Sequence, residues 1–320
     1  MPSPTNKIPQ TQRDHGGGLD AAMTLYGGSR SDWLDLSTGI NPESFPVRKM
    51  QPEAWTALPD HNANQNLIES ARLFWQVPAG AAILAAPGAS ALIATLPALA
   101  SPQTVQITPP TYNEHAAGFR AHGWAVSDHG PAQARVLVHP NNPDGRLWTE
   151  QDVTAPLTVI DESFCDISPE QSLISLADRP GVIVLKSFGK FWGLAGLRLG
   201  FAIGHPDLIA KLETWQGPWA VSGPALQIGA QALQDHDWAT ATRKRLTQDA
   251  ERLDALVLAH GGQLAGGTPL FRLYEVDDAA AWHDQLARAH ILSRVFPYSK
   301  TYLRLGLPPA NGWDRVKAAL

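Results

Sequence analysis

Short apolar runs alternate with helical and glycine-interrupted stretches through the first two thirds of the chain. The apolar runs predict strands at 81–86, 104–108, 124–127, 135–139, 157–160, 182–185 and 199–203. The stretches between them predict helices at 64–74, 91–100 and 112–122. Because several of these strands are short and wholly apolar, both faces of the sheet must be covered. We therefore expect an α/β unit with a mostly parallel sheet sandwiched by helices.

The pattern changes after Pro206. Helices are predicted at 207–215, 224–233, 237–260, 279–290 and 312–320, with strands at 268–276, 291–296 and 301–305. Near the start, a short helix at 19–25 and a strand at 33–37 are expected, and residues 1–14 look disordered or loosely attached. This predicts a large domain over 46–222. A smaller α+β domain is built from 1–45 and 223–320, with a cleft between the two.

Composition narrows the class of protein. Of the 320 residues 44% are hydrophobic, the net charge is −5, and no basic block is present, which argues against nucleic-acid binding. The apolar stretch 79–100 is interrupted by Pro87, Gly88 and Pro97, so a buried strand and helix are favoured over a membrane span. The polar start resembles no signal peptide, and the single cysteine, Cys165, fits a reducing compartment. A cytoplasmic protein is expected.

The most informative stretch is VIVLKSFGKFWGLAGLRLGFA, residues 182–202. A lysine, Lys190, follows a buried strand among glycines, with Ser187 three residues before it and Arg198 eight residues after it. A lysine so placed can form a Schiff base, while the hydroxyl and the guanidinium hold a phosphate. This pattern is typical of the lysine that binds pyridoxal 5'-phosphate (PLP).

Two polar residues at strand ends add to the lysine segment. Asp161 ends an apolar strand, where ligands of parallel sheets bind, and could pair with a protonated pyridine nitrogen. A carboxylate that caps the next loop is an equally good interpretation. Asn142 follows the strand at 135–139 and could donate to a phenolate oxygen of the cofactor, although turn formation is the stronger interpretation of that loop in isolation.

Several weaker candidates have ordinary structural explanations too. Gly88-Ala89-Ser90 opens a helix after a strand and could bind a phosphate through backbone N–H groups. Tyr112 could stack on a flat ring or merely belong to the core. Arg294 and Arg304, on two predicted neighbouring strands, could grip anions or face water. His15 could contribute a polar contact to a ligand. Cys165 is best explained by core packing.

Taken together, these motifs resemble the fold-type I PLP enzymes, the aspartate aminotransferase superfamily. The matching segments are residues 88–90, Tyr112, 141–145, 161–164, 187–190 and 193–198. Within the superfamily the chain is most similar to the branch of histidinol-phosphate aminotransferases and threonine-phosphate decarboxylases. His15-Gly16-Gly17, the segment 33–42 and the segment 303–308 are similar to the decarboxylases of cobalamin biosynthesis in particular.

The resemblance implies a role for each matching residue. Lys190 would carry the cofactor, Asp161 would partner the pyridine nitrogen, and Tyr112 would stack on the ring; these three are the expected catalytic residues. Expected cofactor contacts are Gly88, Ala89, Ser90, Tyr112, Asn142, Asp161, Ser187, Lys190 and Arg198. Expected substrate contacts are His15, Ile40, Asn142, Arg294 and Arg304. No metal is expected.

Two positions depart from the family pattern. Phe164 stands where many relatives have a tyrosine that contacts the cofactor phenolate, and Leu58 stands where many have a tyrosine that reaches the neighbouring subunit's cofactor phosphate. Both changes weaken the case for a fast aminotransferase without abolishing PLP chemistry.

The resemblance therefore implies decarboxylation of O-phospho-L-threonine to (R)-1-amino-2-propanol O-2-phosphate, in cobalamin biosynthesis. The alternative is an aminotransferase acting on histidinol phosphate or a similar phosphorylated amino substrate. The resemblance also implies a homodimer acting on a small molecule, while the charge and hydropathy patterns argue against a nucleic-acid or membrane partner.

Overall fold

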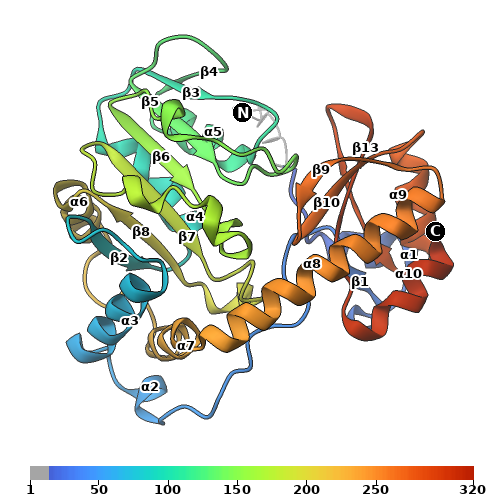
Figure 1. Cartoon of the computed structure of the whole chain (residues 1–320), viewed down its shortest axis with the longest axis horizontal. Helices are drawn as coiled ribbons and strands as arrows, with labels where there is room; N and C mark the ends of the chain where they lie inside the picture. Colours follow the sequence, from blue (N-terminus) through green and yellow to red (C-terminus); the bar gives the residue numbers. More distant parts are fainter. Residues whose placement is uncertain (1–13) are drawn as a thin grey trace, which may run out of the picture.

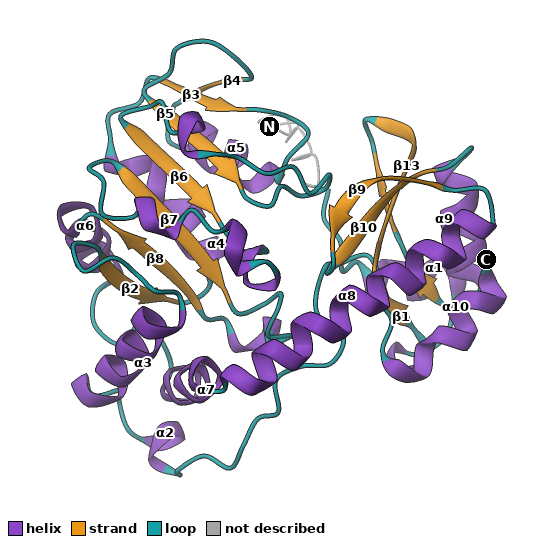
Figure 2. Cartoon of the chain, in the orientation of Figure 1, coloured by secondary structure: helices purple, strands orange, loops and turns teal. Residues whose placement is uncertain are grey.

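The computed structural model describes residues 14–320, and the prediction for the first residues of the chain lies almost wholly outside them. Two sheets lie in two lobes, and a long helix, α8 (His236–Ala259), runs from one lobe to the other (Figure 1). The larger lobe holds a broad sheet with helices around it, and the smaller holds a short antiparallel sheet (Figure 2).

The larger sheet has seven strands in the order β2-β8-β7-β6-β5-β3-β4. They are β2 (Ala82–Ala86), β3 (Thr104–Ile107), β4 (Ala125–Ser127), β5 (Ala134–Val138), β6 (Leu157–Asp161), β7 (Val182–Ser187) and β8 (Gly200–Gly204). The pairs from β4 to β7 are parallel, while β8 runs antiparallel to both of its neighbours. The expected mostly parallel sheet is confirmed.

Helices cover both faces of this sheet because successive side chains of each strand point to opposite sides. Val159 of β6 packs into the core beneath α4 (Ala89–Thr95), α5 (Asn113–Ala121) and α6 (Pro206–Gln216). Ile160, the next residue, packs into the core beneath α3 (His61–Phe74) and α7 (Gly223–Gln234). Full burial on both sides explains why these strands read as unbroken apolar runs.

The smaller sheet is antiparallel, in the order β12-β13-β10-β9. Its strands are β9 (Gln263–Thr268), β10 (Phe271–Glu275), β12 (Arg294–Phe296) and β13 (Ser299–Gly306). The helices α9 (Ala279–Arg288) and α10 (Trp313–Ala319) belong to the same lobe. Asp278 caps α9, because its carboxylate accepts hydrogen bonds from the N–H groups of Ala280 and Ala281.

The N-terminal part packs on this smaller lobe, as its pattern suggested. The strand β1 (Leu34–Asp35) pairs in parallel with β11 (Ile291–Leu292), and α1 (Leu19–Tyr26) shares a small core with Trp33, Ala287 and Leu292. A short helix, α2 (Glu53–Thr56), lies in a stretch for which the sequence predicted neither a helix nor a strand. The domain boundaries drawn from the sequence stay a prediction.

Two predicted strands were wrong in detail. The single strand expected at 268–276 is the second half of a hairpin, β9 and β10. Gly266 and Gly267 have φ of 159° and 127°, and no apolar alternation marks β9. The strand expected at 291–296 is split: β11 pairs with β1, whereas β12 pairs with β13. The break allows the two halves to join different sheets.

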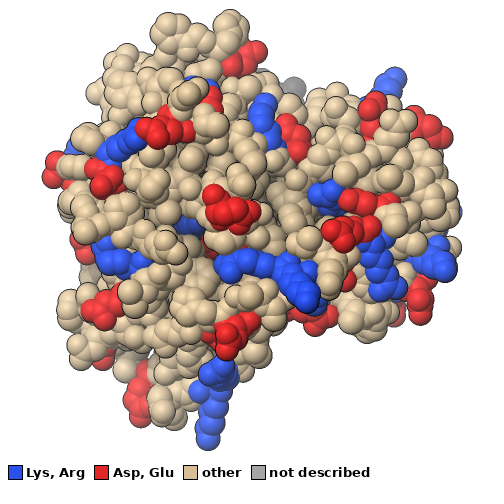
Figure 3. All heavy atoms as spheres, viewed as in Figure 1, with Lys and Arg blue, Asp and Glu red and all other residues tan. Residues whose placement is uncertain are grey.

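The surface agrees with the modest net charge. On the face shown in Figure 3, basic and acidic side chains are interspersed over both lobes. Within residues 14–320, no helix combines the length and the hydropathy needed to span a membrane.

Candidate active site

Two adjoining cavities open at the carboxyl ends of the parallel strands, where α/β sheets bind ligands. The larger is about 1000 Å³ and extends between the two lobes, and the smaller is about 110 Å³ and lies against the large sheet. Both are lined by Tyr112, Asn142, Phe164 and Lys190. The predicted lysine therefore lies where the two cavities meet.

Lys190 follows β7 in a tight turn. Its backbone carbonyl accepts a hydrogen bond from the Asn41 N–H at 3.0 Å, and its Nζ lies 5.3 Å from the centre of the Phe164 ring. Burial, reinforced by the Arg304 guanidinium, lowers the pKa of Lys190 to about 8. A substantial share of the amine is therefore neutral near physiological pH, as a nucleophile requires.

Asp161, at the end of β6, is buried and fully hydrogen-bonded. One carboxylate oxygen lies 2.8 Å from His115 Nε2, and the other accepts hydrogen bonds from the Ser163 hydroxyl at 2.6 Å and the Ser163 N–H at 3.0 Å. Burial acts to raise the pKa of Asp161, but the bonds from His115 and Ser163 outweigh it and the pKa lies below its usual value. The site thus keeps a negative charge in an apolar setting.

The smaller cavity has the features of a phosphate site. It is lined by residues predicted for that role, namely Ala89, Ser90, Ser187 and Arg198. Gly88 does not line it but permits its shape: its φ is 89°, and a Cβ there would lie 2.5 Å from Arg198 Nη2. Gly200 plays a similar part, since a Cβ on it would lie 2.4 Å from the Ala89 nitrogen.

Arg294 and Arg304 are directly opposite each other on β12 and β13, and both line the larger cavity. Arg304 donates through Nη1 to the Asn142 side-chain oxygen and through Nη2 to the Ser37 carbonyl at 2.6 Å. Burial and the nearby Arg294 charge lower the pKa of Arg304 to about 10, which leaves it protonated. Two cations held side by side favour an anionic ligand.

The Arg304 contact also orients Asn142. A guanidinium can only donate, so the Asn142 atom facing it must be the oxygen, and the amide nitrogen points elsewhere. Because Asn142 lines both cavities, its N–H₂ group is available as a donor where they meet.

Of the remaining predicted contacts, His15 lines the larger cavity, with its Nε2 2.8 Å from Glu114 Oε1. Ile40 is half-buried and is not among the residues that line either cavity. Tyr112 borders both, with its ring centre 6.1 Å from those of His15 and His115.

Sequence reasoning missed several residues of the site. His115 could have been found, because it lies three residues after Tyr112 on the same predicted helix and hence on the same face. Asp14, Tyr298 and Tyr302 also line the larger cavity, and no motif marks them.

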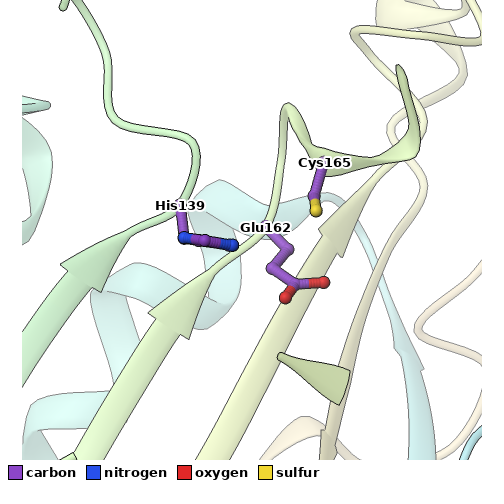
Figure 4. Close-up of side chains that lie close together, drawn as sticks. All are labelled: His139, Glu162 and Cys165. Atoms are coloured by element: carbon purple, nitrogen blue, oxygen red, sulfur yellow. The ribbon is translucent and has the colours of Figure 1, made fainter. Parts of the chain in front are cut away.

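A buried cluster of His139, Glu162 and Cys165 lies beside the strand ends, with its side chains pointing toward one another (Figure 4). His139 Nδ1 accepts from the Trp148 N–H at 3.0 Å, so Nε2 carries the proton that the Gln171 carbonyl accepts at 2.7 Å. Both nitrogens are thus engaged.

The other two members of the cluster are no better suited to a metal. Glu162 accepts from Ser172 and Leu173 and lies 2.6 Å from Lys186 Nζ. Burial and the Glu162 charge raise the pKa of the Cys165 thiol, which keeps it protonated. Core packing, as the sequence suggested for Cys165, is confirmed by its complete burial.

Several known proteins are similar to this chain over nearly its whole length. A protein of Pseudomonas aeruginosa named threonine-phosphate decarboxylase is 38% identical, with 96% of this chain and 97% of the relative covered. A Sinorhizobium protein of the same name is 39% identical over 94% of this chain and 95% of its own length. A histidinol-phosphate aminotransferase from Sinorhizobium meliloti, solved in complex with pyridoxal-5'-phosphate, superposes with a TM-score of 0.79 at 19% identity. That superposition covers 99% of this chain and 97% of the other.

The family model described as "Aminotransferase class I and II" matches residues 127–312, which is more than half of the chain. The matched region runs from β4 to the start of the last helix and includes Asp161, Lys190 and both cavity arginines. With the fold and the two near-full-length relatives, this establishes that the chain belongs to the class I and II aminotransferase family.

Proposed function

We propose that this protein is a PLP-dependent decarboxylase that converts O-phospho-L-threonine to (R)-1-amino-2-propanol O-2-phosphate. The observation that carries the proposal is the pairing of Arg294 with Arg304 in the cavity that also holds Lys190. Two cations beside the reactive amine suit a substrate with two anionic groups, a carboxylate and a phosphate. Both near-full-length relatives bear the name of this activity.

The residues around the smaller cavity fit PLP. A buried carboxylate that keeps its charge, Asp161, suits a protonated pyridine nitrogen, which supplies the cation that such a charge needs. Ser90, Ser187 and Arg198 would hold the phosphate, and Asn142 would donate to the phenolate oxygen. When bound, PLP supplies an electron sink for the electron pair left at the substrate Cα.

The side chains of this protein would bind and orient the substrate. Arg304 would hold the carboxylate, and Arg294 with His15 would hold the phosphate at the far end of the larger cavity. Lys190 would deliver the proton that takes the place of the carboxylate at the substrate Cα, and its lowered pKa favours this transfer.

The environment of Lys190 bears on the choice between decarboxylation and amine transfer. Phe164, whose ring contacts the lysine ammonium, brings no hydroxyl to this position. It packs edge to face on Phe271 with ring centres 4.9 Å apart, so an apolar ring stands beside Lys190 in place of a hydroxyl that could assist amine transfer.

The decisive assay uses the PLP-loaded enzyme and O-phospho-L-threonine labelled at the carboxyl carbon. We expect release of labelled CO₂ without any added keto acid, and no release from a Lys190→Ala variant. Lys211→Ala, a change on the exposed face of α6, is the matched control and should behave as the wild type. Amine transfer from histidinol phosphate to 2-oxoglutarate, with no CO₂ from phosphothreonine, would establish the aminotransferase alternative instead.

Assembly and location complete the proposal. We place the protein in the cytoplasm, as a homodimer that serves cobalamin biosynthesis. Large exposed apolar side chains of the larger lobe, Trp55, Leu58 and Trp219, support a subunit contact. Size-exclusion chromatography with light scattering tests the dimer.

A further inference from the structure

The segment 14–17, which we call the N-terminal strap, forms part of the wall of the larger cavity. The Asp14 carbonyl accepts a hydrogen bond from Asn113 Nδ2 at 2.9 Å, and the His15 ring contacts Glu114. The Gly17 N–H donates to the Ser37 hydroxyl at 2.7 Å. The strap is therefore attached to α5 of the larger lobe and to the segment after β1.

The Asp14 side chain reaches the other wall of the cavity. Its carboxylate lies 2.6 Å from Arg294 Nη1, and the two side chains are 37% and 12% exposed. Arg294 is thus already paired with a carboxylate of the chain itself, at the position where the substrate phosphate would bind.

A guanidinium edge that binds a carboxylate cannot bind a phosphate at the same time. Asp14 is tethered within reach of Arg294, so it competes at a high effective concentration. A phosphate ester carries more charge and more acceptor oxygens than a carboxylate, and it can displace this competitor where a weaker anion does not.

We propose that Asp14 is an internal anion that occupies Arg294 in the substrate-free enzyme and is displaced by the substrate's phosphate. The inference deepens the proposed function and rests on it for the identity of the displacing group. It implies that the strap lowers the affinity for every anion by the same factor. Weakly bound anions then fail to occupy the cavity, and a phosphate ester still binds.

The strap is built to hold Asp14 in this position. A Cβ on Gly16 would lie 2.3 Å from the Ser37 carbonyl oxygen, so the backbone approaches the neighbouring segment as closely as glycine allows. The contacts of the Asp14 carbonyl, His15 and Gly17 limit the conformations of the strap, which strengthens the competition of Asp14 for Arg294.

The test is the affinity of the PLP-loaded enzyme for inorganic phosphate, measured by calorimetric titration of the wild type and the Asp14→Asn variant. Asparagine keeps the size of the side chain and removes its charge. We expect phosphate to bind about two- to fivefold more tightly to the variant, the range that corresponds to release of one partly exposed ion pair. The KM for O-phospho-L-threonine should fall by a similar factor.

The matched control is Asp20→Asn, which removes the same charge from the exposed face of α1 and should leave phosphate affinity unchanged. If Asp14 instead positions Arg294 for the substrate, the Asp14→Asn variant will bind phosphate more weakly, and an equal affinity would equally overturn the inference. A wild-type enzyme that releases no CO₂ contradicts the proposed function alone, because the phosphate titration does not depend on turnover.

Discussion

The ion pair between Lys186 and Glu162 lies beneath the active site, and its removal should destabilise the fold strongly. Lys186 Nζ is 2.6 Å from a Glu162 oxygen and 3.6 Å from an Asp166 oxygen, and the Lys186 and Glu162 side chains are 2% and 0% exposed. Burial alone would lower the pKa of Lys186, but the two carboxylates outweigh it and raise the pKa. The ammonium is therefore charged in the folded protein.

Replacing Lys186 with methionine keeps most of the volume and leaves two buried carboxylates without their cation. Breaking a buried pair on one side costs about 3–5 kcal/mol. For a protein of this size that corresponds to a fall in melting temperature of roughly 4–7 °C. A Lys186→Met/Glu162→Gln double variant should recover part of the loss, because it removes one of the stranded charges.

Two tryptophans lie beside the buried charges of Lys186, Glu162 and Asp166 and can report on their environment. Trp75 and Trp192 each donate to an Asp166 oxygen at 2.9 Å, so two of the eleven tryptophans that contribute to the fluorescence contact the perturbed carboxylate. Thermal unfolding of Lys186→Met is compared with Lys211→Met, an exposed change on α6 that should shift the midpoint by less than about 2 °C. Equal midpoints for the two variants would refute the reasoning.

Three further predictions concern the cofactor site. The rate at which the protein without cofactor gains a visible PLP absorbance should rise with pH through about 8, because the neutral form of Lys190 reacts; a rise centred near 10.5 would contradict this. Gly88→Ala should weaken PLP affinity about tenfold in an absorbance titration, through strain at positive φ and contact with Arg198. Gly196→Ala, where a Cβ meets nothing within 4 Å, should not. Asp161→Asn should lower kcat about a hundredfold or more in the CO₂ assay, and a smaller loss would exclude an essential charge.

The large sheet could be predicted because its signal is local. Each strand is an apolar run, and the polar residue that ends a run, such as Asp161, falls at the edge where ligands bind. The cofactor side of the site follows from that rule. What could not be predicted was Lys186, since a lysine at the end of the run 182–187 gives no sign of being buried against Glu162.

The substrate side depends on pairing between distant segments. The opposition of Arg294 and Arg304 is set by the register of β12 on β13, and a strand pattern read across 291–296 conceals the break that creates it. The approach of Asp14 to Arg294 joins residues 280 positions apart. No spacing rule in a single sequence encodes either contact.

Two adjacent carboxylates, Asp161 and Glu162, have different functions in the fold: one borders the smaller cavity and the other forms a buried ion pair. Asp161 ends β6 and Glu162 directly follows it, and the two side chains meet different partners. Glu162 meets a lysine of the chain, so its charge is neutralised internally. Asp161 instead accepts hydrogen bonds from His115 and Ser163. Among the described residues, no lysine or arginine forms a salt bridge with it. The adjoining cavity is where the pyridine nitrogen of PLP would bring a cation to this charge.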